Sequence, residues 1–169
     1  GGIRLGESVS SAGDVNGDGC SDVIVGAPNY SVGQAGEGAA FVFLGSATGL
    51  GAMPGWMDEG NAGGIRLGES VSSAGDVNGD GFSDVIVDSY HEERIRGYYG
   101  SATGLSPVSN WTGQISQPNT GFARAVSSAG DVNGDGYSEV MVSAHLYDNG
   151  ETNEGRVYLY FGSAAGLAT

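Results

Sequence analysis

The stretch GGIRLGESVSSAGDVNGDG occupies residues 1–19 and recurs without a change as residues 63–81. A looser copy, GFARAVSSAGDVNGDG, spans residues 121–136. Equivalent positions in the three copies are separated by 62 and 55 residues. Internal repeats of this length are typical of architectures in which each unit buries its apolar face against the next one. We therefore expect three structural units of the same kind.

Each unit continues with two short apolar runs after its Asp-rich stretch. The first runs are SDVIV at 21–25, SDVIV at 83–87 and SEVMV at 138–142, and the second are AAFVFLGSATGL at 39–50, RIRGYYGSATGL at 94–105 and RVYLYFGSAAGL at 156–167. Trp56 and Trp111 each lie ten residues after the Ser of a GSATGL segment. With the small residues around Val9, Val71 and Val126, these runs give four strand candidates per unit. None shows helical spacing.

Four short antiparallel strands in each repeat predict an all-β protein made of β-propeller blades, and a β-sandwich is the less repetitive alternative. The expected blades are residues 1–62, 63–117 and 118–169, and the third lacks its last strand, which would fall at about residue 173. Propellers have about four to eight blades. We therefore expect either further blades of a larger propeller or a homodimer that forms a six-bladed ring. Phe41, Phe43, Tyr158 and Tyr160 are expected on the open blade faces.

The composition limits the partners of the chain. Twenty acidic residues face only six basic ones, all of them Arg, which gives a formal charge of −14. Such a surface attracts cations and repels phosphate backbones, so nucleic acid is excluded as a partner. No apolar run approaches the roughly 20 residues of a membrane span, and no signal peptide is recognisable in this chain. The single cysteine, Cys20, cannot form an internal disulfide.

The strongest chemical signal is a nine-residue Asp-rich loop at 14–22, which recurs at 76–84 and 131–139. Oxygen-bearing side chains fall at loop positions 1, 3, 5 and 9. They are Asp14, Asn16, Asp18 and Asp22; Asp76, Asn78, Asp80 and Asp84; and Asp131, Asn133, Asp135 and Glu139. The backbone carbonyl at position 7, from Cys20, Phe82 or Tyr137, can add a ligand. Six or seven hard oxygens at this flexible spacing suit Ca²⁺ better than Mg²⁺.

Two other interpretations of these loops fit the sequence less well. An EF-hand needs a Glu at position 12 between two helices, but position 12 is Val25, Val87 or Val142, within a strand candidate. Solvated Asp-Gly turns without a metal would leave nine carboxylates in three matching loops repelling one another. The sequence therefore predicts about three Ca²⁺ ions per chain.

The D-x-N-x-D-G-x-x-D loop between two strands resembles the FG-GAP repeats of integrin α-subunit β-propellers and their bacterial relatives. The naming motif is partly kept: the Phe-Gly position reads Leu5-Gly6, Leu67-Gly68 and Phe122-Ala123, and the Gly-Ala-Pro position reads Gly26-Ala27-Pro28, Asp88-Ser89-Tyr90 and Ser143-Ala144-His145. The resemblance implies a calcium role for the loop oxygens named above. Glu139 departs from the usual Asp.

Other conspicuous residues have structural interpretations. His91 and His145 are expected in exposed loops, without a nucleophile motif or a zinc-ligand pattern beside them. Asp88, Glu92 and Glu93 are expected in a solvated loop rather than in a glycosidase pair. Trp56 and Trp111 share one phase of the repeat, which favours blade packing over sugar stacking. Residues expected in the core between blades are Tyr98, Tyr99, Tyr158, Tyr160 and Phe161, and Cys20 is expected to be a partly buried thiol.

The functional hypothesis is a calcium-stabilised scaffold for extracellular or cell-surface ligand binding or adhesion. Up-and-down connectivity places the calcium loops at one end and the varied connections Gly26–Gly38, Asp88–Arg94 and Ser143–Gly155 at the other, where an unknown protein or glycan would bind. A self-assembling or excised propeller fragment is the alternative. A lectin or hydrolase on a propeller has no motif of its own here, and we expect no enzyme activity.

Overall fold

The computed structural model describes residues 2–168, which form eleven β-strands and one short 3₁₀ turn, η1 (Tyr90–Glu92), with no α-helix. The first sheet contains β1 (Ser8–Gly13), β2 (Asp22–Ala27), β3 (Ala39–Phe43) and β4 (Trp56–Glu59); the second contains β5 (Val71–Gly75), β6 (Asp84–Ser89), β7 (Arg94–Tyr98) and β8 (Trp111–Gln114); the third contains β9 (Phe122–Gly130), β10 (Glu139–Ala144) and β11 (Arg156–Tyr160). The predicted all-β class is confirmed, including a third sheet with three strands.

Each sheet is an antiparallel meander in which strands that are consecutive in sequence pair with each other. The second strand of the middle sheet is covered on both faces, and all six residues of β6 are buried. The first strands end at a bulge, where the register shifts between Ser11 and Gly13 and again between Ser73 and Gly75. Gly13 takes a φ of +75° at this bulge, a conformation that glycine adopts without steric cost.

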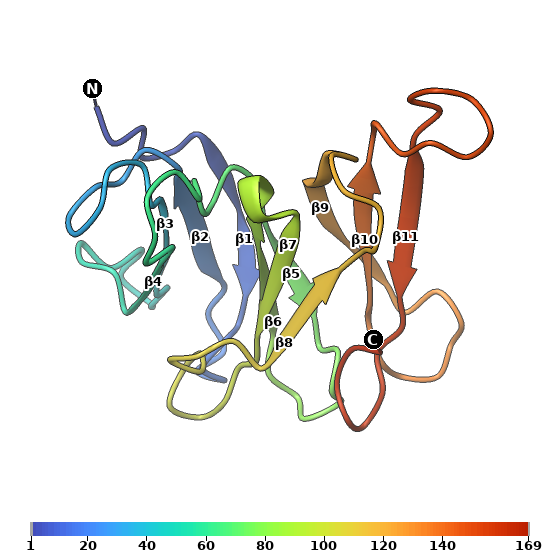
Figure 1. Cartoon of the computed structure of the whole chain (residues 1–169). Coiled ribbons are helices and arrows are strands. Elements are labelled where there is room, and N and C mark those ends of the chain that lie inside the picture. Colours follow the sequence, from blue (N-terminus) through green and yellow to red (C-terminus); the bar gives the residue numbers. More distant parts are fainter. Residues whose placement is uncertain (1, 169) are drawn as a thin grey trace.

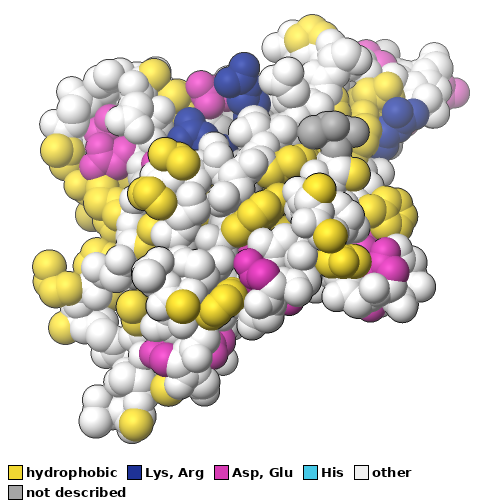
Figure 2. All heavy atoms as spheres, turned by 90° about the horizontal axis from the view of Figure 1, so that it is seen from below, with side chains coloured by type: hydrophobic (Ala, Val, Ile, Leu, Met, Phe, Trp, Pro, Cys, Tyr) yellow, Lys and Arg dark blue, Asp and Glu magenta, His cyan; other side chains and the backbone are white. Residues whose placement is uncertain are grey.

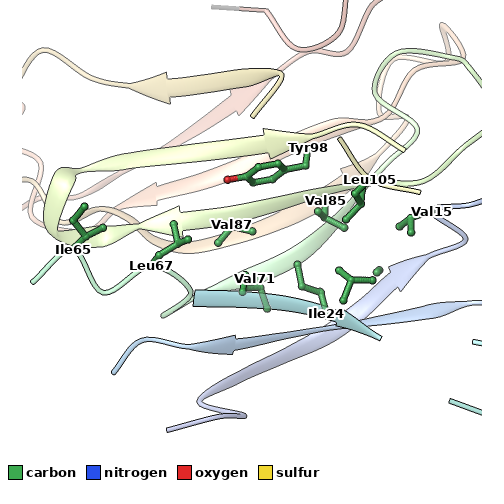
Figure 3. Close-up of a cluster of buried hydrophobic side chains, with 12 residues drawn as sticks. Val15, Ile24, Ile65, Leu67, Val71, Val85, Val87, Tyr98 and Leu105 are labelled. Atoms are coloured by element: carbon green, nitrogen blue, oxygen red, sulfur yellow. The ribbon is translucent and has the colours of Figure 1, made fainter. Parts of the chain in front are cut away.

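The three sheets lie side by side like successive blades of a propeller (Figure 1). The first strands β1, β5 and β9 are neighbours in space, so they form the inner edge of the stack. The core lies between the sheets rather than within them. Figure 3 shows one such cluster, in which Ile24 of β2 faces Val71 of β5, with Val85 and Tyr98 of the second sheet beside them.

Both tryptophans pack between blades, as their common phase in the repeat predicts. The Trp56 ring makes an edge-to-face contact with Tyr98 of the next sheet, with centroids 4.8 Å apart. Trp111 repeats this contact with Tyr160 at 5.0 Å. The Trp56 Nε1–H donates to the Ser106 carbonyl at 2.8 Å, whereas the buried Trp111 Nε1–H has no partner among the described residues.

Two aromatic residues do not lie where the sequence placed them. Phe41 was expected on an open face, but only 8% of it is exposed because Tyr30 packs edge-on against it and Met57 covers it. Phe161 was expected in the core between blades, but it follows β11 and is 44% exposed. In both cases a local connection decides whether the ring is covered, and strand phase alone does not encode this.

Candidate calcium loops and the end opposite them

The three Asp-rich loops join β1 to β2, β5 to β6 and β9 to β10, and all three lie at the lower end of the molecule in Figure 1. Figure 2 looks at this lower end: acidic side chains are scattered over it, and arginine appears only toward one margin. The connections from the second to the third strand of each sheet lie at the opposite, upper end. The predicted division into two ends is therefore observed.

The first Asp of each loop holds the turn together. Asp14 Oδ1 accepts hydrogen bonds from the amides of Gly17 at 2.7 Å and Asp18 at 3.1 Å, and its Oδ2 accepts one from Gly19 at 2.8 Å. Asp76 and Asp131 make the same bonds in their loops. The backbone donors, above all Gly136, lower the pKa of Asp131. This carboxylate is therefore ionised at neutral pH.

The third and fifth positions bond to each other. The Asn16 Nδ2–H donates to Asp18 Oδ2 at 3.0 Å, and the Asp18 amide donates to Asn16 Oδ1 at 3.1 Å. The Cys20 amide donates to Asp18 Oδ1 at 2.9 Å, and this bond, followed by the one from Asn16, lowers the pKa of Asp18. The same pattern recurs at Asn78 with Asp80 and at Asn133 with Asp135.

The ninth position is buried and connects two parts of its blade. Asp22 Oδ2 accepts from the Val15 amide and Oδ1 from the Gly45 amide, both at 2.8 Å. Asp84 makes the equivalent bonds in the second blade, at 2.8 and 2.9 Å. The pKa of Asp84 is raised to about 7, mainly by burial and in smaller part by the nearby charges of Asp80 and Asp76, although the two amides lower it. A cation close to this carboxylate would offset both unfavourable effects.

The third blade departs from this arrangement at Glu139. Its Oε2 accepts from the Val132 amide at 2.7 Å, but its Oε1 is buried without a partner among residues 2–168. Gly162, which matches Gly45, makes no bond to it there. The extra methylene of Glu displaces the second oxygen from that amide. The third loop is thus the one that contains an unpaired buried oxygen.

The seventh position contributes to packing between loops. The Phe82 ring lies against Gly17 of the preceding loop so closely that a Cβ at Gly17 would be 2.6 Å from it. Tyr137 contacts Gly79 in the same way, while Cys20, in the first blade, is a half-exposed free thiol as expected. The carbonyl oxygens of Cys20, Phe82 and Tyr137 accept no hydrogen bond within the described chain, so they are open to a ligand.

The first two loops are also bonded to the next blade. The Ser83 amide donates to the Asp14 carbonyl at 2.9 Å, and the Ser101 amide donates to the Val15 carbonyl at 3.2 Å. Ser138 and Asp76 repeat the first bond at 2.9 Å. Sequence reasoning missed these contacts, because every residue except proline carries a backbone amide and the donors are therefore not marked in the sequence.

Comparison with known proteins assigns this repeated strand–loop–strand unit. The profile described as FG-GAP repeat matches residues 5–43, 67–101 and 122–160, each of which spans one Asp-rich loop and its flanking strands. The chain belongs to the FG-GAP repeat family. Similar proteins include integrin alpha-4 of Xenopus laevis, 35% identical over 162 residues that cover 88% of this chain, and integrin alpha pat-2 of Caenorhabditis elegans, 36% identical over 137 residues that cover 78%. The chain spans 15% and 10% of the length of these two relatives.

The oxygen-only donor set of the FG-GAP loops fits a hard cation such as Ca²⁺, because each carboxylate oxygen that accepts an amide keeps further acceptor capacity. In the described part of the chain, however, no three acidic, His or Cys side chains lie close enough together to form a ready metal cluster. The loop carboxylates accept backbone amides instead. Calcium binding by the fifteen residues named from the sequence stays a prediction.

The upper end of the FG-GAP blades confirms some assignments and corrects one. His91 in η1 and His145 after β10 are both exposed, as expected. Asp88 is not in a solvated loop: it lies in β6 and is fully buried, with Oδ1 accepting the Ser70 amide at 2.9 Å and Oδ2 unpaired. Burial raises the pKa of Asp88 to about 8.

Within residues 2–168, no helix is long and apolar enough to cross a membrane.

Proposed function

We propose that this chain forms part of a calcium-stabilised, extracellular or cell-surface β-propeller scaffold that binds a ligand in adhesion. Its blades would be residues 1–62, 63–117 and 118–169. The observation that carries the proposal is the common hydrogen-bond pattern of the three loops at one end, set against connections at the other end that differ in sequence and of which the middle one is shorter. Its similarity to integrin α subunits supports the adhesion class and a role in binding rather than catalysis.

In this proposal the side chains at loop positions 1, 3, 5 and 9 and the carbonyl at position 7 hold the ion. A bound Ca²⁺ supplies positive charge to a loop of like-charged carboxylates. Three filled sites would reduce the formal charge from −14 to −8, since each ion adds two positive charges. The Gly17 and Gly19 amides keep Asp14 oriented before an ion arrives. The contacts between Phe82 and Gly17 keep consecutive loops in register.

The ligand would bind at the upper end, because a uniform frame with variable loops is where recognition is usually found. The connections there are Gly26–Gly38, Asp88–Arg94 and Ser143–Gly155. We propose a protein or glycan as the partner. It would contact exposed residues of this end of the chain, including His91 and His145.

Titration calorimetry on chelator-treated protein tests the calcium part. We expect uptake of about three Ca²⁺ ions per chain and much weaker binding of Mg²⁺, because Mg²⁺ requires a tighter octahedron. A folded protein, checked by circular dichroism, that takes up no Ca²⁺ at millimolar concentration would reject the proposal.

Self-assembly is a second candidate, favoured by unequal burial at one repeated position. Val15 and Val77 are 0% exposed under the following blade, whereas Val132 of the third blade is 54% exposed. At the other end of the stack, Val9 is 65% exposed, although Val71 and Val126 are 6% and 7% exposed. The two ends therefore carry complementary halves of the interface that joins the blades internally, and a second copy could join head to tail.

Light scattering in Ca²⁺ at micromolar concentration tests this candidate. Association should produce a dimer of two 17.0 kDa chains, and Val132→Glu should reduce it to monomer because the charge would be buried without a partner. Val108→Glu, at an exposed position outside both end faces, serves as the control. A compact monomer in wild type would refute self-assembly.

A further inference from the structure

A cavity of about 560 Å³ is lined by residues before β1 and β5, in η1 and in β9. The segment η1 lies at the upper end of the molecule in Figure 1, opposite the Asp-rich loops. The lining of the cavity includes Arg4 and Glu7 before β1, Arg66 and Glu69 before β5, and Arg124 in β9. Three of the six arginines of the chain thus gather at one site. With two glutamates beside them, the formal charge of these five residues is +1, in a molecule whose total is −14.

The first two repeats pair their arginine with a glutamate three residues later. Arg4 Nη1 lies 3.6 Å from Glu7 Oε1, and Arg66 Nη2 lies 2.7 Å from Glu69 Oε1. In the third repeat the arginine position is taken by Gly121 and the glutamate position by Arg124. The third unit therefore brings a guanidinium to the place where the other two bring a carboxylate.

This third guanidinium has no acidic partner. No ion pair in the described part of the chain involves Arg124, whose guanidinium carbon lies 5.8 Å from the centre of the Tyr90 ring. The acidic residues next to Tyr90 are engaged elsewhere. Glu92 accepts from the Ser89 hydroxyl at 2.7 Å, and Glu93 accepts from the amides of Asn119 at 2.8 Å and Gly121 at 3.0 Å.

One of the residues that line the cavity also carries an unsatisfied donor behind the cavity surface. The Nε–H of Arg66 is buried and has no hydrogen-bond partner among residues 2–168, although the terminal nitrogen of the same guanidinium reaches Glu69. An unpaired buried donor costs free energy, and a charged one costs more than a neutral one. The positive charge of Arg66 is thus only partly compensated at the wall of the cavity, which favours an anion there.

We propose that this cavity binds a carboxylate group of a ligand, with Arg124 as the direct contact. The ligand carboxylate would pair with Arg124 as the Glu69 carboxylate pairs with Arg66. The planar guanidinium group can donate two parallel hydrogen bonds to a carboxylate. The Tyr90 ring positions the Arg124 guanidinium before a ligand binds. The inference rests on the proposed ligand-binding role of the upper end and names the chemistry recognised there.

The experiment is a nuclear magnetic resonance titration of the ¹⁵N-labelled chain, held at saturating Ca²⁺, with glutarate as the probe. Glutaramide, which has the same shape without charge, is the neutral control, and inorganic phosphate is a separate arm. We expect glutarate to shift the Nε–H signal of Arg124, and glutaramide to leave it in place. Arg124→Gln should weaken glutarate binding at least about tenfold.

Arg156→Gln is the matched control, since Arg156 is an exposed arginine of β11 outside this cavity and outside the three connections, and it should bind glutarate like wild type. Equal response to glutaramide, unchanged affinity in Arg124→Gln, or binding of phosphate but not glutarate would each overturn the carboxylate assignment. The absence of any shift up to about 50 mM glutarate, roughly the weakest binding such a titration resolves, would also overturn it. Calcium uptake is measured separately, so each proposal can fail without the other.

Discussion

The backbone N–H of Ser83 donates to the carbonyl oxygen of Asp14 at 2.9 Å, across the boundary between the first and second sheets. Asp14 is also the residue whose carboxylate holds its own loop closed. A change in the conformation of the loop therefore reaches the neighbouring blade through one peptide group. Ser138 and Asp76 repeat the connection at the next boundary. Because of these bonds, an ion in one loop would stabilise the stack as a whole.

Calcium should raise the thermal stability of the entire chain. Ligand that binds only the folded state stabilises it by about 2.7 kcal/mol per site at a hundredfold excess over the dissociation constant. The melting temperature, measured by circular dichroism, should rise with added Ca²⁺ and fall in chelator. Identical melting curves in excess Ca²⁺ and in chelator would contradict the calcium role.

Each loop should lose its ion independently when its fifth residue is changed. Asp18→Ala, Asp80→Ala and Asp135→Ala each remove a carboxylate at the centre of one loop, so calorimetry should count one Ca²⁺ fewer in each variant. Glu151→Ala changes the charge by the same amount in an exposed position outside the loops and should leave the count unaltered. A loss of all ions in one variant would show instead that the sites bind as a unit.

Glu139→Asp should stabilise the third blade. The shorter side chain can reproduce the two bonds that Asp22 makes with Val15 and Gly45, here with Val132 and Gly162, and so remove an unpaired buried oxygen. A recovered hydrogen bond contributes about 0.5–1.5 kcal/mol. Denaturant unfolding at fixed Ca²⁺ measures the difference from wild type. Destabilisation would show that the lost packing of the Glu139 methylene outweighs the recovered hydrogen bond.

Asp58 should be important for the first blade boundary. Its carboxylate in β4 accepts the Tyr98 hydroxyl and, at 2.9 Å, the guanidinium of Arg96, and the Arg96 and Asp58 side chains are only 19% and 17% exposed. Asp58→Ala should lower the free energy of unfolding by about 1.5–3 kcal/mol, because hydrogen bonds to charged groups are lost and Arg96 is left partly buried. Glu59→Ala, at the adjacent half-buried residue, is the control and should cost less. Equal effects of the two substitutions would argue against a special role for the Asp58 contacts.

Asp88 should make stability fall as the pH rises. Burial raises its pKa from 3.8 to about 8, so the folded protein keeps a proton that the unfolded chain releases. The favourable contribution is complete below pH 4 and is lost progressively toward pH 8. Asp88→Asn, which can still accept the Ser70 amide, should flatten this dependence and increase stability at pH 9 relative to wild type.

Unfolding free energies at fixed Ca²⁺ from pH 5 to pH 9 provide the measurement. Asp148→Asn, in an exposed loop, is the control and should follow the wild-type curve. If the stability of Asp88→Asn changed with pH in parallel to that of wild type, Asp88 would not titrate in this range.

Much of the fold could be predicted because it is local. The strands around Val25, Val87 and Val142 follow from short apolar runs, and the loops before them follow from Asp, Asn and Gly at fixed positions. The phase of Trp56 and Trp111 within the repeat was enough to place both rings between blades. Each of these inferences depends only on residues within one repeat.

The sequence by itself therefore determined the strands, the three equivalent loops and the two ends to which the connections go, because strand and turn preferences act over a few residues. Only the tertiary structure decided which side chains meet across blades. It buried Asp88, joined Ser83 to Asp14 and brought Arg124 to the cavity that contains the Arg66–Glu69 pair. These partners lie tens of residues apart in the chain, and their contacts depend on how the twisted sheets stack, which no spacing within a single repeat specifies.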